Sequence, residues 1–355
     1  MKKIIMTGGG TAGHVTPNIA LLPALKEAGY EISYIGSYNG IEKELIEAQN
    51  IPYYGISSGK LRRYLDLKNF SDPFRVAKGF GQAVSLMRKL KPDIVFSKGG
   101  FVSVPVVLAA KLCNIPAIIH ESDITPGLAN KIASKGARKI CCNFPETLKY
   151  LPSEKALLTG SPIRQELLSG DKAFAYEFCK FPSTRKPVLL IIGGSLGSKA
   201  VNQAVRNVLP ELLKDFHIIH LCGKGNLEPS LENLEGYAQY EYISEELTHM
   251  FALCDMAISR AGANAICELL ALRKPNILIP LSAAASRGDQ ILNANSFAKQ
   301  GFSHVIMEED VTDTLLLEAV QQVYTNRQSY IDAMEQSGQM DSIATIVQLI
   351  QQESK

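Results

Sequence analysis

The sequence predicts an α/β protein with two doubly wound domains, each a parallel sheet with helices on both faces. Short apolar runs alternate with amphipathic stretches through the first half of the chain, a pattern typical of parallel sheets. The alternation stops at the Gly/Ser/Pro-containing segment 160–164 and begins again at Val188. This internal repeat predicts an N-terminal domain, 1–161, and a C-terminal domain, 162–340, facing a central cleft. A C-terminal helix, 341–355, could pack back on the first domain.

Each predicted strand is an apolar run bounded by turn residues, and each predicted helix has apolar residues at helical spacing. In the first domain we expect strands at Ile4–Met6, Ile32–Ile35, Asp93–Phe96, Ala117–His120, Lys139–Cys142 and Ala156–Leu158, and helices at Asn18–Ala28 and Val104–Leu112. In the second domain we expect strands at Val188–Ile192, His217–Leu221, Tyr240–Tyr242, Met256–Ser259 and Asn276–Ile279, and a helix at Ala200–Leu213.

The composition indicates a globular protein of the cytosol without a membrane span. The chain has 355 residues, of which 46% are apolar and 20% charged, and it is long enough for two domains with separate cores. No apolar run approaches the ~18–20 residues that a bilayer span needs, and glycines cut the run after Met1 too short for a signal peptide. Seven cysteines, without a C-x-x-C pair, indicate reduced thiols.

Charge is unevenly divided along the chain. Residues 1–160 carry 21 Lys and Arg against 12 Asp and Glu, whereas the remainder carries 16 against 23. The basic excess is concentrated in Lys60–Lys91, where nine basic residues are interleaved with apolar and aromatic ones. Such a stretch suits the surface of an anionic membrane, with nucleic acid as the competing partner. A solvated helix face over ordinary core is the alternative that needs no partner.

The first apolar run ends in a glycine turn, Gly8–Gly13, which precedes a predicted helix. The turn fits G-x-G-x-x-G, and a strand–turn–helix unit exposes backbone N–H groups to an anion. A dinucleotide fold usually has an acid at the end of its second strand, but here that strand ends in Gly36-Ser37-Tyr38. His14, beside the turn, could take a proton from a hydroxyl. We therefore expect phosphate binding and proton transfer here; the alternative is a tight turn that binds nothing.

Two further segments of the first domain follow predicted strands and carry glycine or polar residues. Ser97–Phe101 is another glycine turn, whose Gly99 and Gly100 could cradle a second phosphate group or form a plain turn. His120–Asp123 closes a strand with charged residues, for which a helix cap is the simpler explanation.

The second domain repeats the strand–glycine–helix opening at Gly193–Ser198. Ser259–Asn264 is a strand end followed by small residues, and the helix after it contains Glu268 on an otherwise apolar face. This carboxylate could chelate a ribose diol or face solvent. The polar end of segment 283–290 could bind sugar hydroxyls through amide groups.

Taken together, these motifs resemble those of the bacterial MurG-type glycosyltransferases. The resemblance rests on Gly8–Pro17, the glycine turn of the second domain, Ser259–Ala263 and Asp289-Gln290, and it runs in order from about residue 2 to 300. Ala12 replaces a glycine of the commonest family opening, a change that leaves the backbone donors in place. The resemblance implies a GT-B fold, with the donor nucleotide mainly in the C-terminal domain and the acceptor and membrane contact in the N-terminal one.

The activity that this resemblance implies is an inverting transfer of GlcNAc from UDP-GlcNAc. The acceptor would be the C4 hydroxyl of MurNAc in undecaprenyl-diphospho-MurNAc-pentapeptide, so that lipid I becomes lipid II in peptidoglycan synthesis. A peripheral position on the cytoplasmic face of the cell membrane follows, with no cofactor and no nucleic-acid partner. The chain has no Asp-x-Asp pair, so we expect no metal-dependent GT-A chemistry.

The resemblance also assigns roles to individual residues. Thr11, Ala12 and Gly13 are expected to approach the donor sugar or phosphates, and Gly99 and Gly100 to lie at the acceptor diphosphate. At the donor we expect Arg164 and Ser195 at the diphosphate, Glu268 at the ribose, Ile243 and Ala263 along the nucleotide, and Gln290 with Asp289 at the GlcNAc hydroxyls. His14 is the expected general base, with Glu121 and Asp123 in reserve; Asp123 stands where the family commonly has Asn.

Alternatives of two classes remain. A GT-B relative with another acceptor, or a UDP-GlcNAc 2-epimerase, would share the architecture, but an epimerase needs no lipid contact, so the basic apolar stretch argues against it. A nucleotide- or nucleic-acid-binding protein would use the basic face and the phosphate loops without acting on sugar nucleotides.

Overall fold

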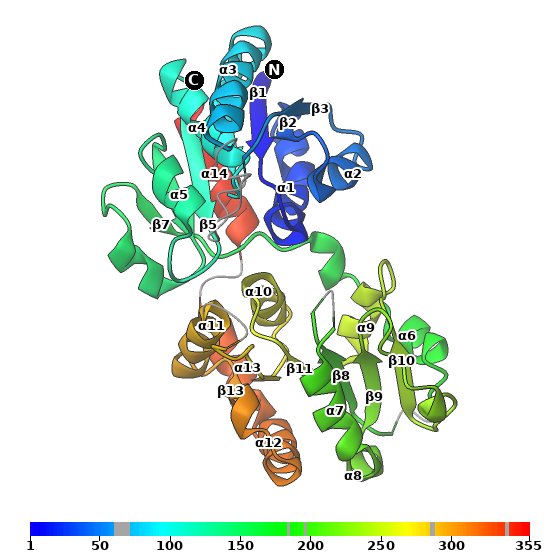
Figure 1. Cartoon of the computed structure of the whole chain (residues 1–355). Helices are drawn as coiled ribbons and strands as arrows, with labels where there is room; N and C mark the ends of the chain where they lie inside the picture. Colours follow the sequence, from blue (N-terminus) through cyan, green and yellow to red (C-terminus); the bar gives the residue numbers. More distant parts are fainter. Residues whose placement is uncertain (60–71, 183–184, 195–196, 285–287, 338–340) are drawn as a thin grey trace. The chain divides into compact units, whose positions relative to one another are not determined.

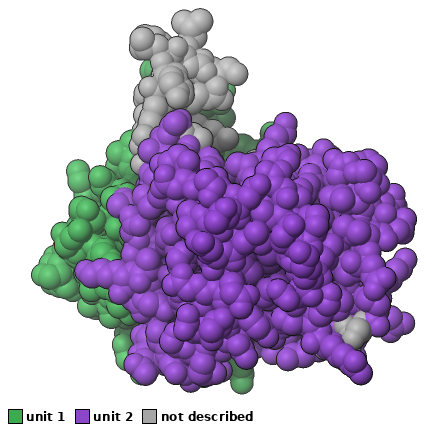
Figure 2. All heavy atoms as spheres, turned by 90° about the horizontal axis from the view of Figure 1, so that it is seen from below, with its two compact units in different colours: residues 1–164, 341–355 green, residues 165–340 purple. Residues whose placement is uncertain are grey.

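The computed structural model describes residues 1–59, 72–182, 185–194, 197–284, 288–337 and 341–355. The chain divides into two compact units, coloured separately in Figure 2. Unit 1 contains Met1–Arg164 together with Asp341–Lys355, and unit 2 contains Gln165–Met340. Arg164 is therefore the last residue of unit 1 before the chain enters unit 2, whereas the sequence analysis placed this boundary after residue 161.

Unit 1 is built on a seven-stranded sheet in which all neighbouring strands are parallel (Figure 1). The strand order is β3-β2-β1-β4-β5-β6-β7. The strands are β1 (Lys2–Thr7), β2 (Tyr30–Ser37), β3 (Tyr53–Ile56), β4 (Ile94–Ser97), β5 (Ala117–Glu121), β6 (Lys139–Cys142) and β7 (Ala156–Leu158).

Helices cover both faces of this sheet. Side chains alternate along β1, so Ile4 and Met6 join one core cluster and Ile5 joins the other. The first cluster packs under α1 and α14, and the second under α3 and α4. The helices are η1 (Ala12–His14), α1 (Thr16–Glu27), α2 (Ile41–Glu47), α3 (Asp72–Leu90), α4 (Ser103–Leu112), α5 (Leu128–Ala133), η3 (Pro145–Tyr150) and α14 (Ser342–Glu353).

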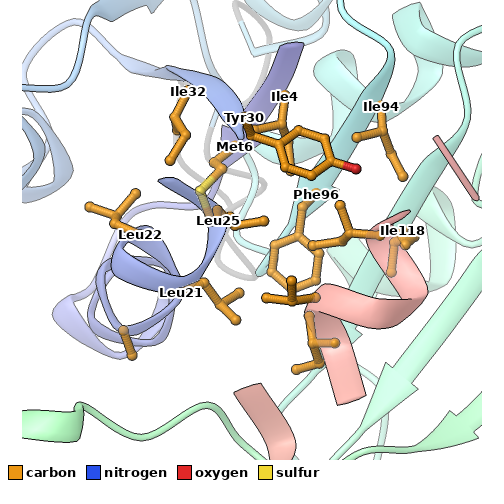
Figure 3. Packing of buried hydrophobic residues seen from close by; sticks show 14 of the residues in the cluster. Ile4, Met6, Leu21, Leu22, Leu25, Tyr30, Ile32, Ile94, Phe96 and Ile118 are labelled. Carbon is orange, nitrogen blue, oxygen red and sulfur yellow. The ribbon is translucent and has the colours of Figure 1, made fainter. Parts of the chain in front are cut away.

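The C-terminal helix α14 supplies part of the first core cluster. In Figure 3 the ring of Phe96 lies among aliphatic side chains from the sheet and from α1, with α14 beside it. Two hydrogen bonds fasten the ends of this helix, from Ser342 Oγ to Ser161 O at 2.6 Å and between Ser354 Oγ and Tyr30 OH at 2.7 Å. The last helix of the chain is thus part of the core that supports β1.

Unit 2 contains a six-stranded parallel sheet of order β10-β9-β8-β11-β12-β13. Its strands are β8 (Val188–Ile192), β9 (His217–Leu221), β10 (Tyr237–Tyr240), β11 (Met256–Ser259), β12 (Asn276–Leu278) and β13 (His304–Val305). Its helices are η4 (Gln165–Leu168), α6 (Lys172–Phe178), α7 (Lys199–Asn207), α8 (Leu209–Asp215), η5 (Pro229–Leu231), α9 (Leu247–Leu253), α10 (Ala263–Ala271), α11 (Asp289–Lys299), η6 (Glu308–Asp310), α12 (Asp313–Thr325) and α13 (Arg327–Glu335).

The predicted fold class is confirmed by these two parallel sheets, and four details of the prediction are wrong. Strands β3 and β13 were not predicted from the sequence because they are short and only partly apolar. Strand β10 spans Tyr237–Tyr240 and shares only Tyr240 with the strand expected at Tyr240–Tyr242, whose last residue is 70% exposed. The single helix expected at 200–213 is two helices, because Pro210 near the start of α8 lacks the N–H that would continue α7.

The strand order reverses once in each sheet, beside β1 in unit 1 and beside β8 in unit 2. In open α/β sheets, ligands bind outside the carboxyl ends of the strands at such a reversal. The topology therefore indicates that ligands bind at the loops after β1 and β4 in unit 1, and at the loops after β8 and β11 in unit 2. Within the described part of the chain, no helix is both long enough and apolar enough to cross a bilayer.

Candidate functional site

The first glycine turn of unit 1 follows β1 and is held from below by buried polar side chains. Tyr34 OH donates to Gly8 O at 2.8 Å, and Asn18 Nδ2 donates to Tyr34 OH at 3.0 Å and to Thr7 O at 3.2 Å. Gly10 has φ +88°, a conformation that a side chain would strain. Thr11 and Ala12 beyond it are exposed, and Gly13 is half-buried. The turn therefore has a fixed base and an accessible outer edge.

A buried carboxylate, Glu42 of α2, closes the inner side of this turn. Its Oε2 accepts a hydrogen bond from Gly10 N at 3.2 Å, and its Oε1 accepts from Ser37 N at 3.1 Å and Ser37 Oγ at 2.5 Å. Strand β2 itself ends at Ser37 without an acid, as expected, but α2 brings Glu42 back onto this strand end. The carboxylate is nevertheless turned inward and bonded to backbone, so it is not presented to a ribose.

His14 lies at the end of η1, at the outer edge of the same turn. Its Nδ1 is 3.0 Å from Thr11 Oγ1, and the ring is half-buried. Burial, followed by the nearby Lys98 ammonium, lowers the pKa of His14 to about 4. At neutral pH the imidazole is therefore uncharged and has a lone pair that can accept a proton.

The second glycine turn of unit 1 begins with a buried lysine at the end of β4. Lys98 is 1% exposed, and its Nζ donates to His120 Nδ1 at 2.6 Å and to Ser122 Oγ at 2.7 Å. His120 Nε2 is 2.9 Å from Gly160 O; since a carbonyl can only accept, the ring proton is on Nε2 and Nδ1 accepts from Lys98. Burial and the Lys98 charge hold the pKa of His120 well below its usual value. A cation is thus fixed directly before the turn.

Gly99 and Gly100 continue this turn and bring it against the first one. Their φ values are +96° and +85°. A Cβ on Gly100 would collide with Gly9 O, so the backbones of the two turns touch. Ser103 Oγ at the start of α4 donates to Gly99 O at 2.6 Å. The structure thereby brings the predicted phosphate turn and the turn that carries His14 side by side.

Both carboxylate oxygens of Glu121 accept hydrogen bonds from the loop and helix that follow β5. One oxygen accepts from Ser122 N at 2.9 Å and Asp123 N at 3.1 Å, and the other accepts from Gly127 N at 3.1 Å and Asn130 Nδ2 at 2.9 Å. Burial raises the pKa of this carboxyl group, although the hydrogen bonds oppose the shift. These contacts favour a role as a loop anchor. Asp123 is half-buried at the same strand end, and its carbonyl accepts from Thr147 Oγ1 at 3.3 Å.

In unit 2 the corresponding glycine turn follows β8 and leads into α7. Gly194 and Gly197 have φ values of +88° and +74°, and a Cβ on Gly197 would collide with Cys222 O. Ser198 caps α7, its Oγ accepting from Val201 N at 3.3 Å. Ser195, which was expected at the donor diphosphate, lies outside the described residues.

Arg260, which the sequence analysis quoted only as part of a motif, braces this turn. The guanidinium is buried and donates to Ser198 Oγ at 2.6 Å and to Ile279 O and Pro280 O at 3.0 and 3.2 Å. It also forms an ion pair with Glu308. One side chain thus ties together the segments after β8, β11, β12 and β13. No local pattern signals this role, because each partner comes from a distant part of the chain.

Apart from Arg164, the other expected donor residues follow strands of unit 2. Ala263 begins α10 after its N-cap Gly262, and Glu268 is half-buried on the same helix. Ile243 is buried after β10. Gln290 at the start of α11 accepts a hydrogen bond from Leu281 N on Oε1 at 3.0 Å. Arg164 is half-buried at the end of the first part of unit 1.

Known protein families match both units. Residues 4–142 match the glycosyltransferase family 28 N-terminal domain, and residues 188–350 match the glycosyltransferase family 28 C-terminal domain. A Lachnospira eligens protein is 68% identical over all 355 residues, with both chains fully covered, and one from Lachnoclostridium phytofermentans is 66% identical, with 99% of each covered. Each is named UDP-N-acetylglucosamine–N-acetylmuramyl-(pentapeptide) pyrophosphoryl-undecaprenol N-acetylglucosamine transferase.

Solved structures agree with this match. The crystal structure of Acinetobacter baumannii MurG has a TM-score of 0.77 at 27% identity, covering 99% of this chain and all of that one. A UDP-GlcNAc 2-epimerase from Methanocaldococcus jannaschii has a TM-score of 0.70 with 99% of both chains covered, but only 14% identity. The second likeness shows a shared fold and nothing more.

Proposed function

The chain belongs to the transferase family that combines the two glycosyltransferase family 28 domains, and from this premise we propose that it is a UDP-GlcNAc-dependent N-acetylglucosaminyltransferase. Its acceptor is N-acetylmuramyl-(pentapeptide) pyrophosphoryl-undecaprenol, the lipid I of peptidoglycan synthesis. The observation that carries this proposal is the 68% identity over the whole length of both chains to a transferase named for that donor and acceptor. The GT-B architecture and the two family 28 domains agree with it.

The reaction is a single inverting displacement, in which the C4 hydroxyl of MurNAc attacks the anomeric carbon of GlcNAc as UDP leaves. We assign the removal of the hydroxyl proton to His14. The competent tautomer carries its proton on Nδ1 and donates it to Thr11 Oγ1, 3.0 Å away, which leaves the Nε2 lone pair for the acceptor. The low pKa keeps this lone pair available at neutral pH.

The acceptor diphosphate is assigned to the Gly99–Gly100 turn. Lys98 at the start of this turn supplies a positive charge, and its hydrogen bonds to His120 and Ser122 hold that charge in place. A fixed cation costs no reorganisation when the anion arrives, and buried charges are screened little by salt. We therefore expect Lys98 to contribute to binding of the lipid I diphosphate rather than to binding of its sugar.

The donor is assigned to unit 2, where UDP must be stabilised as it leaves. The turn after β8, with Ser195, leads into the N-terminus of α7, and a helix N-terminus favours an anion. Glu268 is assigned to the ribose, Ile243 and Ala263 to the nucleotide, and Gln290 with Asp289 to the sugar. Arg164 is assigned to the diphosphate, and Thr11, Ala12 and Gly13 to the donor sugar or phosphates.

The acceptor is anchored in lipid, so the protein must work at a membrane surface, which we propose to be the cytoplasmic face. Helix α3 supports this, because Phe74 is 79% exposed and Arg75 beside it is also exposed. The first part of the basic segment that the sequence analysis singled out, residues 60–71 with Arg62 and Arg63, lies outside the described residues. An aromatic side chain next to basic ones suits an anionic bilayer.

The decisive experiment is incubation of the full-length protein with UDP-GlcNAc and a short-chain lipid I analogue. We expect UDP release together with a β-linked disaccharide on the lipid. Formation of UDP-ManNAc without disaccharide would overturn the proposal in favour of an epimerase. Retention on DNA or RNA without any turnover of UDP-GlcNAc would instead favour a nucleic-acid-binding protein.

A further inference from the structure

The carboxylate of Glu42 takes no part in the proposed transfer, yet it lies directly behind the turn that carries the base. The side chain is fully buried in the first turn of α2. Its two oxygens accept three hydrogen bonds, from Gly10 N, Ser37 N and Ser37 Oγ. We propose that Glu42 is a positioning residue, which holds the first glycine turn from the inside and thereby fixes Thr11 and His14 for proton transfer.

Three glycines leave the space that this carboxylate occupies. A Cβ on Gly9 would lie 2.5 Å from the carboxylate, and one on Gly36 would lie 2.9 Å from Glu42 Cγ. A Cβ on Gly40 would overlap with the carboxylate itself. A side chain at Gly9 or Gly40 would displace Glu42, and one at Gly36 would collide with Tyr53 OH as well as with Glu42.

The route from Glu42 to the base is short. Gly10 N donates to Glu42, and the chain continues directly into Thr11 and η1. Within that segment His14 N donates to Thr11 O at 3.1 Å, and the His14 ring meets Thr11 Oγ1 at 3.0 Å. These contacts keep residues 11–14 together, so a movement of Gly10 carries the imidazole with it.

Glu42 also acts on His14 through its charge. The groups that act on the pKa of the ring are Lys98, which lowers it, and the Gly9 backbone and Glu42, which raise it against the effect of burial. Removing the negative charge of Glu42 should therefore lower the pKa of His14 further. A group that merely filled space would not produce a shift in that direction, which makes the titration of His14 a selective readout.

The test compares Glu42→Gln with Glu44→Gln, an exposed glutamate of the same helix. Glutamine keeps the shape of the side chain but cannot accept from both Gly10 N and Ser37 N. We expect kcat on the lipid I analogue to fall about tenfold to hundredfold, as for a lost hydrogen bond to a charged group, with a much smaller change in the KM for UDP-GlcNAc. NMR should show a lower pKa for His14 and faster hydrogen exchange at the Gly10 amide. Glu44→Gln should match the wild type in all of these.

Wild-type kcat, His14 titration and Gly10 exchange in a folded Glu42→Gln protein would overturn the inference. If that variant does not fold, Ser37→Ala replaces it, since it removes only the bond from Ser37 Oγ and should give a smaller effect on the same readouts. The inference rests on the proposed role of His14 as the base. The two NMR readouts need no substrate, so they separate a failure of the positioning role from a failure of the proposed reaction.

Discussion

The glycine turns after β1 and β8 occupy equivalent places in their sheets, but they are braced by opposite chemistry. Behind the turn of unit 1 lies the Glu42 carboxylate, which accepts a hydrogen bond from a backbone N–H of the turn, Gly10 N. Beside the turn of unit 2 lies the Arg260 guanidinium, which donates to Ser198 Oγ and to two carbonyl groups. Glu42 thus occupies a backbone N–H group of the turn that an anion would need. Arg260 contacts only acceptor groups and leaves the backbone N–H groups of its turn unaffected.

This difference teaches that the same strand–turn–helix topology does not determine what the turn binds. An N–H group that is bonded to a carboxylate cannot also hold a phosphate, and the negative charge behind it repels one. The turn of unit 1 is therefore better suited to uncharged sugar groups and to carrying a base. The turn of unit 2 is better suited to a diphosphate.

The largest effect that would sharpen this comparison is expected for His14→Ala. Loss of the general base should lower kcat by about 10²–10⁴-fold, while the affinity for UDP-GlcNAc changes little because the donor is held by unit 2. Steady-state kinetics with the lipid I analogue, together with calorimetry of UDP-GlcNAc binding, measure both quantities. Unchanged turnover would rule out His14 as the base.

The brace of unit 2 is tested by Arg260→Met. The change removes four contacts of a buried cation and leaves Glu308 without its ion pair, so the free energy of unfolding should fall by roughly 3 kcal/mol. Urea unfolding measures this loss. The matched control is Arg273→Met, since Arg273 pairs with Glu335 at the surface, at 3.4 Å, and should cost less than about 1 kcal/mol. Equal losses in the two variants would contradict the bracing role.

The assignment of the donor to unit 2 is tested by Glu268→Ala. Loss of one charged hydrogen bond to the ribose should raise the KM for UDP-GlcNAc about tenfold and leave the KM for the acceptor nearly unchanged. Kinetics with each substrate varied in turn separate the two. A defect confined to the acceptor would mean that Glu268 has been assigned to the wrong substrate.

The effect of the Lys98 charge on the pKa of His14 is tested by Lys98→Met. The wild-type pKa of His14 is about 4, so the ring is almost entirely uncharged at neutral pH. Without the Lys98 cation this pKa should rise toward 6.5, and the acidic limb of the pH–rate profile should move to higher pH. NMR titration of His14 gives the direct value, with the exposed Lys111→Met as control. An unmoved titration would show that burial alone depresses the pKa.

The last prediction concerns membrane binding by unit 1 and leaves the chemical step unchanged. Reversing the charges of Arg62, Arg63 and Arg75 together should release the protein from anionic vesicles at physiological salt, because each basic residue near the surface contributes about 1 kcal/mol. Vesicle sedimentation measures the bound fraction, and neutral vesicles provide the control. Equal binding of the variant and the wild type would leave α3 as an ordinary solvated helix.

Candidate residues that stand beside a recognisable local motif could be singled out from the sequence, and residues that act across the fold could not. His14 follows the glycine turn directly, and Gly99 and Gly100 interrupt an apolar pattern, so both attract attention in the sequence. Glu42 resembles any charged residue of an amphipathic helix, and only the fold shows that it lies under Gly10, 32 positions earlier. Lys98 was quoted within its turn without a role, because its partners His120 and Ser122 belong to another strand end.

By itself the sequence determined the positions of most strands, the glycine turns that follow them, and the division into two similar halves, because apolar periodicity and turn residues are local properties. Only the tertiary structure decided which turns become neighbours. The chain returns to pair β4 with β1 after visiting β2 and β3, and this pairing brings Gly100 against Gly9. Such contacts depend on strand order. This order is set by the packing of the whole sheet and cannot be predicted from any short segment of the sequence.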